Sequence, residues 1–305
     1  MTRRIFVIMI CLPVFFLQAA FAQKPVKPLF SFGLISDVQY ADAETIGKRN
    51  YRNSPAKLEK TLEILNAYDL SFIVNLGDLI DRGFENFDKP LKILERSRFP
   101  IHHVWGNHDF AVTDDQKKSV GKKLGNEAGY YSFEEAGFVF IVLNGLDFSM
   151  EGHPQGSVAY NKAVRVMETL TSAGANNAKP WNGGIGDDQL TWFLAQVKNA
   201  GEKGKRAVVF CHYPLLPENG LQLLNNRQLL SALDETQDVV AWFSGHHHEG
   251  NYVRDGRGIH HVTFQGMVEA TTQALGAVIS VYPDKIIVHG IGHEEDRVLE
   301  IVNSE

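Results

Sequence analysis

Cysteine is almost absent from this sequence, with two in 305 residues. Cys11 lies in an apolar N-terminal stretch, so Cys211 is the only cysteine left if that stretch is removed. A disulfide within the mature chain is then excluded, and a domain of this size does not need one. We interpret Cys211, at the end of an apolar run, as a small buried side chain rather than a reactive thiol.

The sequence also lacks an excess of basic residues, with 30 Lys and Arg against 36 Asp and Glu and a formal net charge of −6. A protein that holds long nucleic acid by its phosphates usually has a basic surface, so we expect no such partner. A small phosphorylated or nucleotide-like substrate remains compatible with this charge, because bound cations can reverse the local field.

Long apolar runs are missing too, apart from one at residues 5–16. It follows two arginines and precedes Ala20-Phe21-Ala22, which has the small-x-small form of a signal-peptide cleavage site. The run is shorter than the roughly 20 residues that span a membrane. We predict a signal peptide at residues 1–22 and a single domain at 23–305, exported to the periplasm or secreted. An uncleaved membrane anchor is the less favoured alternative.

Strand-like apolar runs alternate with amphipathic helical patterns along the rest of the chain. Buried strands are predicted at 206–211 and 239–244, and a helix at about 158–172. The last three predicted strands, at 260–265, 276–282 and 285–289, are expected to pair antiparallel. Residues 151–186 are rich in Gly, Asn, Ser and Pro around one short helix, and we interpret them as an excursion over the active edge. The mixture predicts an α/β fold in which two packed β-sheets are flanked by helices.

Residue types that bind metals stand at the ends of five predicted strands. Such ends converge on one edge of a layered sheet protein, where carboxylate, amide and imidazole groups would hold two divalent cations. Two cations at one site suit the attack of hydroxide on a phosphate ester. Any one of the histidines alone would be interpreted as a surface residue; their coincidence favours a metal site. The five segments are Asp37-Val38-Gln39, Gly77-Asp78-Leu79-Ile80-Asp81, Gly106-Asn107-His108-Asp109, Cys211-His212 and Gly245-His246-His247-His248.

In this order, the five segments resemble the motifs of the calcineurin-like metallophosphoesterase superfamily. Asp37-Val38-Gln39 stands where the superfamily usually has Asp-x-His. Together with Trp105-Gly106-Asn107-His108 and Tyr282-Pro283-Asp284-Lys285, this variant resembles the branch of manganese-dependent ADP-ribose/CDP-alcohol diphosphatases. The similarity runs from about residue 32 to residue 297 and includes Asn182-Gly183-Gly184 and His260-His261-Val262, which are not among the ligands. The resemblance implies a four-layer αββα sandwich. It also implies a hydrolase that cleaves the diphosphate of small nucleoside-diphosphate-linked compounds with a metal-bridging hydroxide.

Ligand chemistry and the resemblance together assign the metal ligands. A carboxylate with two oxygens suits the bridging position, which we assign to Asp78. Mixed oxygen and imidazole ligands suit two Mn²⁺ ions, with Fe or Zn as alternatives. Gln39 offers a neutral carbonyl oxygen and should bind its metal more weakly than an imidazole would. The remaining ligands are Asp37, Gln39 and His248 at one metal, and Asn107, His212 and His246 at the other. His247 should point away from the metals.

The other candidate residues act outside the metal shell. His108 could donate a proton or stabilise charge on a phosphate. Asp109 is expected either to orient that imidazole or to cap a helix, and a cap or supporting hydrogen bond is expected of Asp81. Asn225 and Arg227 match an Asn-x-Arg of the resembled branch, so Arg227 could pair with a phosphate, although a surface salt bridge is equally consistent with the sequence.

Two other functions fit parts of the sequence. An exported phosphomonoesterase or phosphodiesterase would use the same ligands on a different substrate. A metal-bound binding module without turnover belongs to another class, and the complete set of seven ligand positions together with His108 argues against it. The sequence leaves the leaving group and the oligomeric state open.

Overall fold

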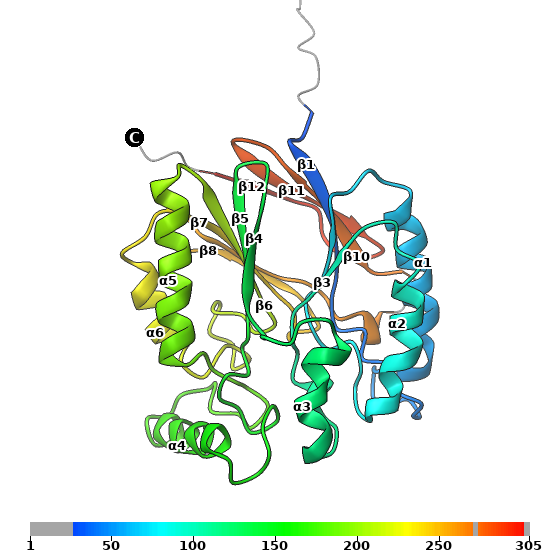
Figure 1. Ribbon diagram of the computed structural model, residues 1–305, viewed down its shortest axis with the longest axis vertical. Coiled ribbons are helices and arrows are strands. Elements are labelled where there is room, and N and C mark those ends of the chain that lie inside the picture. Colours follow the sequence, from blue (N-terminus) through cyan, green and yellow to red (C-terminus); the bar gives the residue numbers. More distant parts are fainter. Residues whose placement is uncertain (1–26, 271–273, 302–305) are drawn as a thin grey trace, which may run out of the picture.

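Two six-stranded sheets lie face to face at the centre of the molecule (Figure 1). The computed structural model describes residues 27–270 and 274–301; the predicted signal peptide lies outside them. No helix within these ranges is both long and apolar enough to cross a membrane. The first sheet has the order β12-β11-β10-β1-β2-β3 and the second β4-β5-β6-β7-β9-β8.

The described part of the chain contains six α-helices. Figure 1 shows α1 and α2 on one side of the two sheets and α5 and α6 on the other. The helices are α1 (Ser54–Asn66), α2 (Asp88–Leu94), α3 (Asp114–Lys123), α4 (Val158–Ser172), α5 (Asp187–Glu202) and α6 (Asn226–Leu233). The strands are β1 (Phe30–Ile35), β2 (Ile73–Asn75), β3 (Ile101–His103), β4 (Tyr131–Glu135), β5 (Phe138–Leu143), β6 (Arg206–Cys211), β7 (Val239–Ser244), β8 (Asn251–Arg254), β9 (His260–Thr263), β10 (Gly276–Val281), β11 (Lys285–Ile291) and β12 (Arg297–Glu300).

The central strands are apolar on both faces because each face meets another layer. Alternate side chains of β1, β5 and β6 enter the core between the sheets, where the ring centre of Phe32 lies 5.6 Å from that of Phe140 and 5.9 Å from that of Phe210. The opposite face of β5 packs under α5, with Phe193 and Val197 fully buried. The interface therefore has the apolar, close-packed character of a protein core, and it fixes the two sheets relative to each other.

Parallel pairing brings the functional loops to one edge. Strand β1 pairs parallel with β2, and β2 with β3. In the second sheet β6 pairs parallel with both β5 and β7. The carboxyl ends of β1, β2 and β3 therefore face one way in the first sheet, and those of β6 and β7 end together in the second. The loops after β1 and β2 are joined directly, since the backbone N–H of Gln39 donates to Asp78 O at 2.8 Å.

The predicted αββα sandwich is confirmed, but the pairing of one strand is corrected. Residues 260–265 were expected to close the chain beside the last two strands. Instead β9 lies in the second sheet, parallel to β7 and antiparallel to β8. The two strands after it do pair antiparallel, as predicted. Alternation of apolar and polar residues predicts a strand and its buried face, but it does not predict which strand pairs with it. The pairing of β9 is therefore seen only in the structure.

Candidate metal centre

The seven predicted ligands follow five strands, and four of them have unusual backbone conformations. Asp37, Gln39, Asp78 and His246 have φ angles of 49°, 43°, 54° and 67°. Left-handed backbone is uncommon for residues other than glycine and concentrates at functional sites. In this protein it occurs directly after β1, β2 and β7, where these side chains lie among the other predicted ligands.

Asp109 joins the loop after β2 to the loop after β3 through hydrogen bonds from their backbone N–H groups. Its Oδ1 accepts from the backbone N–H of Leu79 at 2.8 Å and of Ile80 at 3.3 Å, and its Oδ2 accepts from Asp78 at 3.1 Å and Gly106 at 3.0 Å. Burial and the charge of Asp78 raise the pKa of Asp109, and the backbone N–H groups oppose that rise. Asp109 therefore supports the backbone beneath Asp78, a role different from both that were expected.

Gly106 completes that support. Any Cβ at this position would overlap the carboxylate and backbone nitrogen of Asp78. The absence of a side chain lets the loop after β3 approach the loop after β2, and the backbone N–H of His108 then donates to Asp78 Oδ1 at 2.8 Å. The predicted ligand Asn107 thereby lies beside Asp78, the residue predicted to bind both metals.

The structure gathers the seven residues into two groups that share Asp78. On one side His248 Nε2 lies 3.3 Å from Asp37 Oδ1 and 3.1 Å from Gln39 Nε2, which donates to Asp78 Oδ2 at 3.0 Å. On the other side His212 Nε2 lies 3.3 Å from Asp78 Oδ2 and 3.1 Å from Asn107 Oδ1. Residues predicted to share one metal thus lie beside one another, and their roles as ligands stay a prediction.

The second group also includes His246. Asp78, His212 and His246 can each direct one ligand atom so that all three atoms lie within 4.8 Å of one another. The rings of His212 and His246 have their centres 5.1 Å apart. This is the compact cluster of carboxylate and imidazole donors that a divalent transition metal requires.

Two of the histidines are held so that one ring nitrogen is defined as the donor. His212 Nδ1 lies 2.9 Å from the carbonyl oxygen of Leu76, and His248 Nδ1 lies 3.1 Å from Glu269 Oε1. Both partners accept hydrogen bonds, so Nδ1 carries the proton and Nε2 is left for a ligand. Such outer contacts fix the tautomer and orientation of metal-binding histidines.

The residues present fit a pair of divalent cations. Gln39 Oε1 is buried without a hydrogen-bond partner in the described structure, a costly state, while Gln39 Nε2 faces Asp78 and His248. Rotation of this amide would exchange its two ends and turn the oxygen towards a cation among these ligands. Burial opposes protonation of His212, but Asp78 outweighs it and raises the pKa of His212 to about 9. Burial likewise opposes protonation of His248, whose contacts with Asp37 and Glu269 raise its pKa to about 9. In the metal-free protein, protons therefore occupy sites that cations would take.

His108 stands beside the cluster and is oriented by Asp81. Its Nδ1 lies 3.1 Å from Asp81 Oδ1 and 3.2 Å from Asp81 O, which leaves Nε2 for a substrate. Burial lowers the pKa of His108, but the carboxylates of Asp78 and Asp81 outweigh it and raise that pKa to about 9. Cations bound at Asp78 would offset part of that charge. The imidazole is therefore placed and polarised as a proton donor.

A pocket of about 520 Å³ opens over these residues. Five predicted ligands line it, and the part of the pocket that they form is called its floor: Gln39, Asp78, Asn107, His246 and His248. The rest of its lining combines one guanidinium, three carboxylates, the predicted catalytic imidazole and larger side chains: Arg49, Glu151, Glu249, Glu269, His108, Trp181, Leu221 and His247. The pocket has room for a small phosphorylated molecule with its phosphate on the floor.

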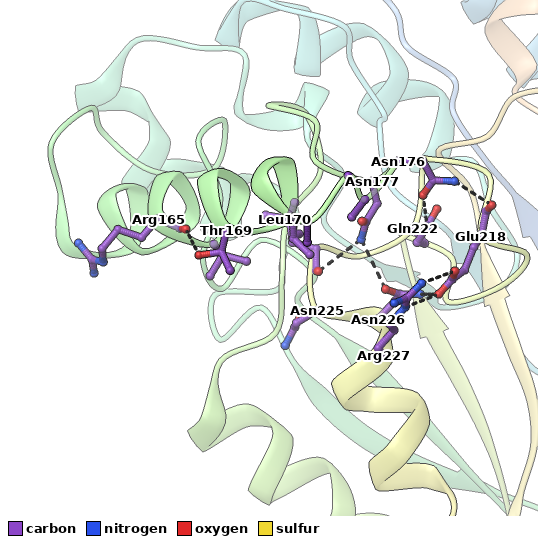
Figure 2. Close-up of a pocket in the computed structure, with 15 residues that line it drawn as sticks. Arg165, Thr169, Leu170, Asn176, Asn177, Glu218, Gln222, Asn225, Asn226 and Arg227 are labelled. Atoms are coloured by element: carbon purple, nitrogen blue, oxygen red, sulfur yellow. Dashed lines mark hydrogen bonds and ion pairs between the residues drawn. The ribbon is translucent and has the colours of Figure 1, made fainter.

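Asn225 and Arg227 line a different pocket of about 670 Å³, shown in Figure 2. Arg227 pairs with Glu218 through two contacts of 2.9 and 3.0 Å, and its side chain is 81% exposed. Asn225 exchanges hydrogen bonds with the backbone of Ile185 at 2.9 and 3.2 Å. Both residues thus have partners within the protein, and phosphate binding by either of them stays a prediction.

Three residues near the cluster were not found from the sequence. Glu151 accepts from Asn107 Nδ2 at 2.7 Å, which turns Asn107 Oδ1 towards His212. Glu269 holds His248, and Asn182 Oδ1 lies 3.1 Å from His246 Nε2. Asn182-Gly183-Gly184 was noted as part of the resemblance without a role. The other two are single acidic residues in loops, so the sequence carried no signal for them.

Comparison with known proteins agrees with this geometry. The chain belongs to the calcineurin-like phosphoesterase family, whose model matches residues 30–250. It is 31% identical over 326 residues to the manganese-dependent ADP-ribose/CDP-alcohol diphosphatase of Xenopus tropicalis, covering 90% of this chain and 94% of that protein. The human protein of the same name is 30% identical over 318 residues, covering 89% and 92%.

A solved structure shares the whole architecture. A dimetal phosphatase from Danio rerio superposes with a TM-score of 0.80 at 26% identity, covering 90% of this chain and 100% of that one. These similarities confirm the family resemblance found in the five motifs. The protein is an enzyme of the dimetal phosphoesterase family, and its particular substrate is a separate question.

Proposed function

We propose that this enzyme hydrolyses the diphosphate of small nucleoside-diphosphate-linked compounds, such as ADP-ribose and CDP-alcohols, with two Mn²⁺ ions. The observation that carries the proposal is the convergence of the seven ligand residues, five of which line one pocket together with His108, while Asp37 and His212 lie directly against His248 and Asp78. The relatives at about 30% identity that bear the diphosphatase name support this substrate class. The dimetal phosphatase from Danio rerio supports two metals.

In this proposal, seven side chains bind the metals and one donates a proton. Asp78 is shared between two metal sites, with Asp37, Gln39 and His248 at one and Asn107, His212 and His246 at the other. Two divalent cations held by these residues would supply a hydroxide nucleophile at neutral pH and offset the negative charge of the phosphate. His108, held by Asp81, donates a proton from Nε2 to the departing phosphate oxygen.

A substrate panel separates this proposal from its alternatives. The purified protein is assayed with Mn²⁺ on ADP-ribose, CDP-choline, cyclic nucleotides and p-nitrophenyl phosphate. Preference for the first two supports a diphosphatase. Preference for p-nitrophenyl phosphate or for a cyclic nucleotide would instead indicate a monoesterase or a phosphodiesterase, and Mn²⁺ binding without turnover of any compound would indicate a binding module.

We also propose that the enzyme acts outside the cytoplasm, in the periplasm or after secretion. The arginines, apolar run and Ala20-Phe21-Ala22 in residues 1–22 support export. Cell fractionation with N-terminal sequencing of the mature protein tests this, and the proposal expects a chain that begins at Gln23. A full-length chain in the cytoplasm would contradict it.

A further inference from the structure

Asn182 is a buried amide that links a predicted metal ligand to the loops above it. It lies in the excursion between α4 and α5 and is 1% exposed. Its Nδ2 donates to Asn177 O and to Gly220 O, each at 2.9 Å. Its Oδ1 lies 3.1 Å from His246 Nε2. All the polar atoms of this side chain therefore have partners within the protein.

These contacts determine which way the amide points. The carbonyl oxygens of Asn177 and Gly220 can only accept, so the atom that faces them both must be the NH₂ group of Asn182. The oxygen of Asn182 must then face His246. Because that oxygen can only accept, His246 Nε2 has to carry the proton, and the lone pair of the ring lies on Nδ1.

The backbone contacts of His246 do not determine the tautomer of its ring. Its backbone is fixed independently, because its N–H lies 3.2 Å from both carboxylate oxygens of Asp37. In His212 and His248 the outer contact is made by Nδ1 and leaves Nε2 for the metal. In His246 the outer contact is made by Nε2, so this histidine offers the opposite nitrogen.

We propose that Asn182 is a positioning residue that selects the Nε2–H tautomer of His246 and so presents Nδ1 to one metal. The proposal rests on the proposed metal centre, because it takes His246 as a ligand. It also gives a physical reason for Asn182-Gly183-Gly184, since Gly183 and Gly184 allow this segment to pack against Gly145 and Phe148 without a clash.

Asn177 provides a matched control in the same network. It is buried to a similar extent, at 3% exposed, and its Nδ2 donates to Leu223 O at 2.8 Å and to Leu224 O at 3.3 Å. Asn177→Ala removes those anchors but keeps the backbone carbonyl that Asn182 uses. Asn177→Ala therefore reports the effect of loosening the loops alone, without loss of the contact between Asn182 and His246.

The tautomer can be read in the metal-free full chain by ¹⁵N NMR of the histidine rings, at a pH above the usual pKa of imidazole. The signals of His246 are assigned by their loss in His246→Ala. The wild type and Asn177→Ala should show a protonated Nε2 and an unprotonated Nδ1. Asn182→Ala should show a mixture of tautomers, whereas Asn182→Asp, which keeps an acceptor, should retain the wild-type tautomer.

Calorimetric titration with Mn²⁺ gives a second measure that does not depend on turnover. Asn182→Ala should weaken one of the two sites by about 10–100-fold, the usual effect of losing such an outer contact, and Asn177→Ala should leave both sites as they are. An unprotonated Nε2 in the wild type would overturn the proposal, even if Asn182→Ala does not fold. Equal losses in Asn182→Ala and Asn177→Ala would also overturn it. Neither result would bear on the substrate panel.

Discussion

Replacement of Asp109 by asparagine should destabilise the protein strongly, although the side chain touches no substrate. Both carboxylate oxygens accept from backbone N–H groups, two each, in the loops that carry Asp78 and Gly106. In Asp109→Asn one oxygen becomes an NH₂ group, which meets two N–H donors instead of pairing with them. Because the pKa of Asp109 is raised, its charge adds no stability of its own, and the loss comes from the two buried N–H donors left unpaired. At about 1–3 kcal/mol for each unpaired donor, the expected loss is about 2–6 kcal/mol.

Denaturant unfolding of the metal-free protein measures this loss without a contribution from bound metal. Asp88→Asn is the control, because the Asp88 side chain is 74% exposed and pairs only with Lys123 in the described structure. That variant should lose less than about 1 kcal/mol, as surface ion pairs do. A loss below about 1 kcal/mol in Asp109→Asn, matching the control, would refute the support that we assign to Asp109.

Other substitutions and conditions test the site itself. His108→Ala should keep both metals, as elemental analysis would show, yet lower kcat by about 10²–10⁴-fold; parallel loss of metal would make His108 a structural residue. Gln39→His should raise Mn²⁺ affinity in titrations, and an unchanged titration would remove Gln39 from the ligands. Because the pKa values of His212 and His248 are about 9 without metal, Mn²⁺ must displace their protons at pH 7. Calorimetry in buffers of different ionisation enthalpy should detect the released protons, and affinity should rise with pH; absence of release would contradict the assignment.

Elements with strong local signals were predicted well from the sequence. The bounds of α4 agree with the prediction, since Ser157 caps its first turn by accepting from Tyr160 N. Strands β6 and β7 also agree, because each is a continuous apolar run buried on both faces. Weakly patterned elements were missed. Helix α3 is mostly charged and buries only Val120 and Gly121, although Thr113 and Gln116 form a capping box at its start.

The site was predicted in composition but not in its outer contacts. Ligand types at strand ends could be recognised because parallel strands end at one edge. The partners of those ligands come from loops far away in the sequence, as when Glu269 contacts His248 and Glu151 contacts Asn107. The left-handed backbone of Asp37 and Asp78 likewise has no marker in residue type, because it is imposed by surrounding hydrogen bonds.

The proposed metal centre and substrate class are tested most directly by product analysis of ADP-ribose incubated with the wild type and with Asp78→Ala. We predict Mn²⁺-dependent cleavage to AMP and ribose 5-phosphate by the wild type. Asp78→Ala should lose both metals and this activity, since Asp78 is shared between the two groups of ligands. Full activity in Asp78→Ala would contradict the metal centre. Failure of the wild type to cleave ADP-ribose or CDP-choline, while it hydrolyses p-nitrophenyl phosphate, would contradict the proposed substrate class.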